Sequence, residues 1–60
     1  MFLPGDTVIH SKGGRYKIID RCFIESTLTE CYAYREISSS LIWIRPVLEM
    51  EDGRFKLCIK

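Results

Sequence analysis

Hydrophobic positions in this chain fall into short runs that alternate with polar residues, and no stretch keeps a helical repeat. Clusters of Gly, Ser, Pro and acidic residues separate the runs. Short alternating segments bounded by such clusters are typical of a small all-β sandwich or barrel. We therefore expect five strands, over Thr7–His10, Arg15–Phe23, Thr29–Arg35, Leu41–Arg45 and Arg54–Ile59.

The connections between these strands suit tight chain reversal. Ser11-Lys12-Gly13-Gly14 is the strongest hairpin signal, because adjacent glycines supply the positive φ angles that a tight turn requires. Before the last strand, Val47–Met50 has the length of one turn of 3₁₀ helix. These features predict one domain spanning residues 1–60, folded as a small five-stranded SH3-like barrel with a short 3₁₀ turn before the last strand.

The longest expected strand, Arg15–Phe23, divides its side chains into two sets, because successive residues of a strand point to opposite faces. One set is apolar and is expected to face the core. The other is largely charged and is expected to face solvent. The core set is Tyr16, Ile18 and Cys22, and the opposite set is Arg15, Lys17, Ile19, Arg21 and Phe23.

The chain length and the net charge limit the classes of function that fit this sequence. A chain of 60 residues buries only about 60% of its unfolded surface, so self-association is one way in which such a domain gains stability. Nine Lys or Arg against eight Asp or Glu give a net charge of +1, which does not predict strong attraction to a phosphate backbone. The apolar runs are far shorter than the ~20 residues of a membrane helix, so no membrane partner is expected.

Several residues of the first hairpin and the fourth strand form a recognisable pattern. They are His10-x-Lys12-Gly13-x-x-Tyr16-x-Ile18, then Tyr34, Trp43-x-Arg45-Pro46 and Met50. This pattern, over residues 5–55, resembles an uncharacterised family of small bacterial and phage proteins, described as a domain of unknown function. The resemblance implies a phage or prophage accessory protein in the cytoplasm of a bacterial host cell, without an assigned activity. Many members carry a mid-chain histidine that is absent here, where the stretch reads Ile24-Glu25-Ser26-Thr27.

The cysteines and the histidine are a poor basis for metal binding. Cys22, Cys31, Cys58 and His10 match the number of ligands in a Cys₃His zinc site, but structural zinc sites usually bring their ligands in close pairs along the chain. Cys22 and Cys31 could face each other across the expected second hairpin. The odd cysteine count and wide spacing favour free thiols that pack as small hydrophobes, and we expect no metal and no cofactor.

The sequence also lacks a catalytic constellation. His10 lies at a strand end beside a hairpin, and no Ser or Cys near it sits in a recognisable nucleophile turn. We expect His10 to hydrogen-bond a turn backbone or an aromatic hydroxyl. We therefore predict a protein that is not an enzyme.

Two surfaces are candidates for binding. The first hairpin holds Lys12, Arg15, Lys17 and Arg21, which would serve a small nucleic-acid-binding or nucleotide-binding barrel, although Asp20, Glu25 and Glu30 lie near them. This basic hairpin is the alternative hypothesis.

The favoured candidate centres on Trp43 and Arg45, which lie two residues apart and so share a strand face at about 6.6 Å. Either Trp43 fills the barrel while Arg45 pairs with Glu36 or Glu49, or Ile42 and Ile44 point inward and Trp43 faces a partner. We predict the second arrangement, in a non-catalytic protein-interaction module that binds a protein partner or itself. The expected partner-binding residues are Trp43, Arg45, Tyr16, His10 and Tyr34.

Overall fold

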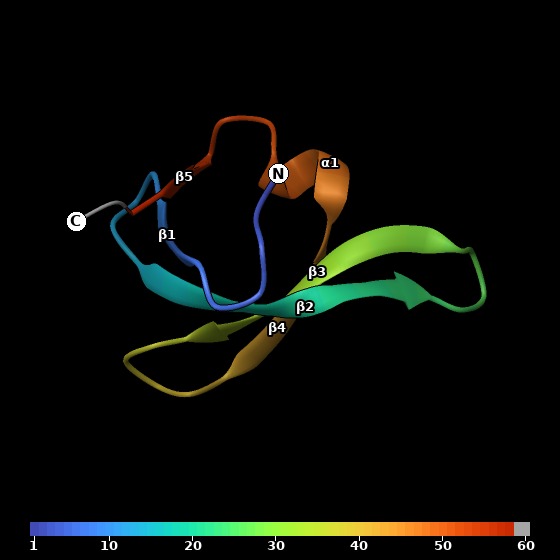
Figure 1. Cartoon of the computed structure of the whole chain (residues 1–60), viewed down its shortest axis with the longest axis horizontal. Helices are drawn as coiled ribbons and strands as arrows, with labels where there is room; N and C mark the ends of the chain where they lie inside the picture. Colours follow the sequence, from blue (N-terminus) through green and yellow to red (C-terminus); the bar gives the residue numbers. More distant parts are fainter. Residues whose placement is uncertain (59–60) are drawn as a thin grey trace.

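A computed structural model describes residues 1–58 of the chain, which form an antiparallel sheet and one short helix (Figure 1). The elements follow the expected order with small changes of boundary. The last expected residue of the fifth strand, Ile59, lies outside the described residues. The elements are β1 (Thr7–His10), β2 (Arg15–Ile24), β3 (Thr29–Glu36), β4 (Ile42–Pro46), α1 (Val47–Met50) and β5 (Phe55–Leu57).

The strands form one sheet in the order β4-β3-β2-β1-β5. The two longest strands, β2 and β3, make a hairpin that extends beyond the rest of the domain (Figure 1). The all-β prediction is confirmed. Within residues 1–58, however, β4 and β5 are the two sheet edges and do not pair, so these strands do not close the expected barrel. Closure needs hydrogen bonding around the whole circumference, and β5 has only three residues, which pair with β1.

The helical turn before β5 differs in kind from the prediction. The Glu51 N–H donates to the Val47 carbonyl at 2.9 Å, which is the spacing of an α-helix rather than that of a 3₁₀ helix. Pro46 stands directly before this turn in an extended conformation (φ -56°, ψ 143°), and its side chain makes no capping hydrogen bond. The turn buries Met50 against the core.

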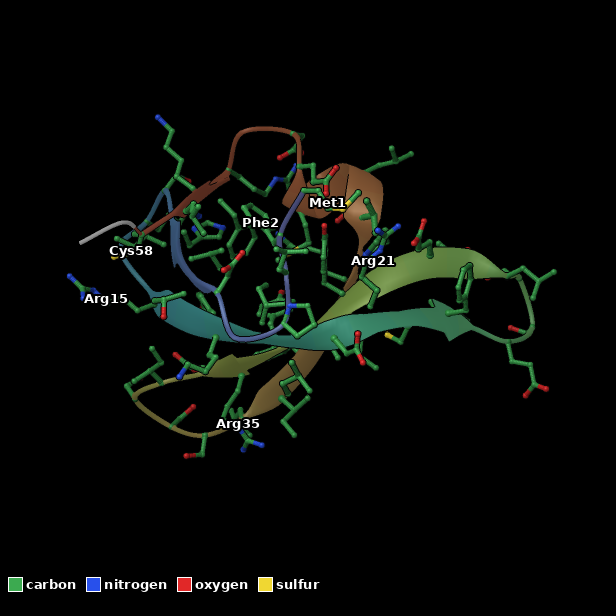
Figure 2. The ribbon with its side chains drawn as sticks, viewed as in Figure 1. Met1, Phe2, Arg15, Arg21, Arg35 and Cys58 are labelled. Carbon is green, nitrogen blue, oxygen red and sulfur yellow. The ribbon has the colours of Figure 1, made fainter. Side chains whose placement is uncertain are left out.

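The core lies on one face of the sheet and is unusually aromatic. Tyr32 is completely buried at its centre. Its hydroxyl accepts a hydrogen bond from the Phe2 N–H at 3.0 Å and donates one to Glu51 Oε2. In Figure 2, Phe2 lies on one side of the β2–β3 ribbon and Arg35 on the other. The buried core residues are Phe2, Val8, Ile18, Tyr32, Tyr34, Met50 and Phe55.

A β-bulge in β2 overturns the predicted division of that strand. Ile18 lies opposite Tyr34, but Asp20 lies opposite Ala33, so one extra residue is inserted between them. An inserted residue reverses the faces of all that follow it. The prediction that Arg21 and Phe23 lie with Arg15 and Lys17, and Cys22 with Tyr16 and Ile18, is therefore wrong.

Candidate functional site

A cavity of about 200 Å³ opens on the core face of the sheet. All five strands contribute to it, with two residues from β4 and one from each of the others. The structure thus brings together the five residues predicted to bind a partner and adds Phe55. The lining residues are His10, Tyr16, Tyr34, Trp43, Arg45 and Phe55.

Phe55 organises the aromatic floor of this cavity. Its ring packs edge-to-face against His10 at 4.8 Å, Tyr34 at 5.7 Å and Tyr16 at 5.8 Å between centroids. Tyr16 and Tyr34 pack edge-to-face against each other at 5.3 Å. Such pairs favour their geometry beyond simple area burial. The floor is therefore a connected set of rings with fixed orientations.

The glycines of the first hairpin allow this packing. Gly13 has a φ of +104°, and its N–H donates to the His10 carbonyl at 2.7 Å. At Gly14 an added Cβ would stand 3.0 Å from the Tyr16 ring, which shows that the ring lies directly against the backbone of the turn. The turn therefore positions Tyr16 through a close approach that only glycine permits without rearrangement.

His10 has one ring nitrogen committed to this turn. Its Nδ1 accepts a hydrogen bond from the Lys12 N–H at 3.0 Å, so the prediction of a bond to the turn backbone is confirmed. In the neutral imidazole the proton must then reside on Nε2. His10 therefore adds an N–H donor beside the aromatic floor.

The register of β4 contradicts the predicted face of Trp43, although the side chain is still half exposed. Trp43 lies opposite Tyr34 and therefore shares the core face, whereas Ile44 lies opposite Ala33 on the other face. The hypothesis that Ile42 and Ile44 point inward is wrong. Trp43 is nonetheless 49% exposed, because β4 is an edge strand and the indole stands at the rim of the cavity.

Arg45 forms the polar side of the cavity. Its Cζ lies 5.7 Å from the centroid of the Phe55 ring, within the range of a cation–π contact. Its Nε stands 3.7 Å from Glu49 Oε1, so of the two expected partners the structure selects Glu49, at a distance longer than a good hydrogen bond. Arg45 Nη1 is buried and has no hydrogen-bond partner within residues 1–58.

Tyr34 remains a phenol in this setting. Burial raises the pKa of Tyr34 above its ordinary value, and the nearby positive charge of Arg45 opposes that shift only in part. The hydroxyl is therefore protonated at neutral pH. It contributes a polar group without negative charge.

The basic residues of the first hairpin do not form one surface. Arg15 and Lys17 are exposed on the face opposite the core, where Lys17 lies directly across from Arg35. Arg21 emerges on the core face after the bulge and forms an ion pair with Glu30. Figure 2 shows Arg21 beside Met1 and far along the hairpin from Arg15.

The cysteines are free, and two of them are neighbours. Cys22 lies directly opposite Cys31 on β3, as the spacing suggested. Burial, followed by the nearby Cys31 and Asp20, raises the pKa of the Cys22 thiol, so the thiol is protonated at neutral pH. No cluster of three or more His, Cys, Asp or Glu side chains suited to a metal ion is found in residues 1–58.

Two residues were missed by the sequence reasoning. Phe55 was identified only as part of an alternating strand, and its place at the cavity depends on the pairing of β5 with β1. Arg35 was not placed opposite Lys17, because that position depends on the β2–β3 register. The alternation of apolar and polar residues indicated that each side chain lies on one face of its strand. It did not indicate which strand lies beside it.

Comparison with family models, with curated proteins and with solved structures finds no match for this chain. The resemblance to the small bacterial and phage family therefore stays a prediction. In the part of the chain that the structure describes, no helix has the length and apolar character needed to cross a bilayer.

Proposed function

We propose that this chain is a non-catalytic protein-interaction module whose contact surface is the cavity bounded by Trp43 and Arg45. The observation that carries the proposal is the convergence of aromatic rings and one guanidinium from all five strands. Trp, Tyr and Arg are the residues most enriched where protein interfaces gain their affinity. A half-exposed indole at the rim of a preformed cavity is suited to capture a partner side chain.

The size and chemistry of the cavity favour a protein side chain over a substrate. Its volume of about 200 Å³ lies below the roughly 300–1,000 Å³ of most small-molecule sites. The titratable groups are arranged for packing, since His10 bonds the turn backbone and Tyr34 is held as a phenol. We assign the cavity to the recognition of side chains of a protein partner.

The SH3-like arrangement, the kind of partner and the phage setting are likewise proposals. The strand order, with a helical turn before β5, is compatible with an SH3-like arrangement whose closure would be supplied by a partner. The partner is another protein or a second copy of the chain. The phage or prophage setting rests on the sequence resemblance alone.

The test compares two double variants. Trp43→Ala/Arg45→Ala removes the rim of the cavity, and the control Arg15→Ala/Lys17→Ala changes two exposed residues on the opposite face. Circular dichroism first establishes that both variants fold. Sedimentation equilibrium then measures self-association, and photo-crosslinking with quantitative mass spectrometry measures capture of host proteins. The proposal requires loss of association in the first variant only. A folded first variant with unchanged association and crosslinking would refute it.

One observation favours nucleic-acid binding as a second candidate. Lys17 and Arg35 lie directly opposite each other on the outer face, with Arg15 on the same strand as Lys17. Binding of a short single-stranded oligonucleotide that weakens steeply with salt would support it. Because Arg21 lies on the other face and is paired with Glu30, Arg21→Gln should leave that binding unchanged, whereas Lys17→Gln should weaken it.

A further inference from the structure

The outer edge of β4 presents unpaired backbone groups. The Glu36 N–H donates to the Leu41 carbonyl at 2.7 Å, so this carbonyl faces β3, while the Leu41 N–H turns to Ser39 Oγ at 3.4 Å. In an antiparallel pair, residues that face the partner strand in this way alternate with residues whose N–H and C=O point away from it. The N–H and C=O groups of Ile42 and Ile44 therefore point outward, at an edge that no strand of residues 1–58 covers.

This edge is only partly protected. Protected edges carry lysine, inward-pointing charges, bulges or proline. Arg45 is a charge on the core face and Pro46 ends the strand, but residues 42–44 carry neither charge nor proline, and the pairing with β3 is regular. Ile42 and Ile44 are 54% and 60% exposed on the outer face. The strand therefore offers both backbone and side-chain contacts to an incoming strand.

We propose, on the basis of the proposed function above, that the partner is an acidic extended segment of another protein that adds to β4 as an antiparallel strand. Its alternate side chains would lie on the two faces of β4. Those opposite Trp43 and Arg45 reach the cavity. Those opposite Ile42 and Ile44 cover the exposed isoleucines.

Charge complementarity selects a carboxylate for the position beside Arg45. Arg45 lines the cavity with 30% of its side chain exposed, and Glu49 stands too far from Nε to form a good hydrogen bond. The neighbouring indole of Trp43 and Nε2–H of His10 are donors as well. A second copy pairing through the same edge would bring another β4, which contains no carboxylate, so the exposed part of Arg45 would gain no acidic partner from that strand.

The experiment uses three blocked peptides and the fluorescence of Trp43, the one tryptophan of the chain. The probe is acetyl-Thr-Val-Glu-Val-Glu-Val-Thr-amide, in which the central Val pairs with Ile44 and the glutamates face Trp43 and Arg45. The second peptide replaces both Glu by Gln. The third carries an N-methyl group on the central Val, which removes one edge hydrogen bond. Each of these two changes should weaken binding about tenfold or more, since a charge-assisted or backbone hydrogen bond is lost.

Variants of the protein separate the contacts. In Arg45→Gln the Glu and Gln peptides should bind equally, whereas the matched control Arg15→Gln should keep the full difference between them. Equal affinity of both peptides for the unmodified protein would overturn the proposal, as would no binding of any peptide. Unchanged binding of the N-methyl peptide would overturn strand addition. It would leave the proposed function standing if Trp43→Ala/Arg45→Ala, measured by isothermal titration calorimetry because this variant has no tryptophan, abolished that binding.

The mass of the protein in solution distinguishes addition of a partner strand from pairing of two copies of the chain. Sedimentation equilibrium of the protein alone should give a monomer whose mass does not change in Ile44→Lys. A dimer that Ile44→Lys dissociates would show that β4 pairs with its own copy. That result would overturn an acidic partner strand while leaving an interaction module in place.

Discussion

Removal of the Tyr32 hydroxyl should destabilise the fold strongly, because this hydroxyl joins three separate segments of the chain. Tyr32 is fully buried on β3, accepts a hydrogen bond from the N–H of Phe2 and donates one to Glu51 after α1. Tyr32→Phe keeps the ring and removes both bonds. The buried Phe2 N–H is then left without an acceptor.

The expected loss follows from these two bonds. A buried N–H without a partner costs about 1–3 kcal/mol, and a hydrogen bond to a carboxylate contributes about 1.5–3 kcal/mol. Glu51 is one-third exposed and recovers part of its loss by hydration. We therefore expect the free energy of unfolding to fall by about 2–4 kcal/mol. For a domain of this size that corresponds to a Tm lower by roughly 10–30 °C.

The assay is thermal and urea unfolding followed by Trp43 fluorescence and circular dichroism. Tyr34→Phe is the matched control, because it removes the same group from the same strand and face, and the Tyr34 hydroxyl makes no hydrogen bond within residues 1–58. The control should lose less than about 1 kcal/mol. Equal losses in the two variants would refute the role assigned to the Tyr32 bonds.

Three further outcomes are expected. Burial raises the pKa of Tyr32 and Tyr34 above the ordinary value of 10.0, so the folded chain holds these protons more tightly than the unfolded chain. The resulting stability is present below pH 10 and is lost as the pH rises through the raised pKa values. A urea midpoint that stays flat between pH 9 and roughly pH 12 would contradict this. Gly14→Ala should displace the Tyr16 ring by a few tenths of an ångström, since the new Cβ meets that ring at 3.0 Å, and unchanged NMR signals of the Tyr16 ring would contradict the close approach. Because burial raises the pKa of the Cys22 thiol, iodoacetamide at pH 7.5 should alkylate it far more slowly in the folded chain than in urea, and equal rates followed by mass spectrometry would contradict the assignment.

The sequence predicted the bounds of the strands and five of the six residues that line the cavity better than it predicted the faces of the strands. Alternation located each strand within a residue or two. The spacing of an indole and a guanidinium two residues apart pointed to Trp43 and Arg45 as candidate binding residues. The bulge at Ile19 was not recognised, although the alternation of apolar and charged residues breaks at Ile18-Ile19 and Asp20-Arg21, because such a break does not by itself show that a residue is inserted. Arg21 was therefore placed on the wrong face.

The position of Trp43 shows a second limit of pattern reasoning. An edge strand with apolar residues on both faces has no alternation that reports which face is buried. Only the pairing of Trp43 with Tyr34 places the indole on the core face, and only the open edge leaves it half exposed. Within residues 1–58 the sheet also stays open, since the short β5 pairs with β1 and not with β4, and alternation along single strands does not show which strands pair.

The most direct test of the cavity as a protein-binding surface is an NMR titration of ¹⁵N-labelled protein with the acidic strand peptide. The account predicts that the largest shifts occur at the Trp43 indole N–H and at the amides of Ile42 and Ile44, with saturation as the peptide is added. Shifts confined to Lys17 and its neighbours on the outer face, with the Trp43 indole unmoved, would contradict it.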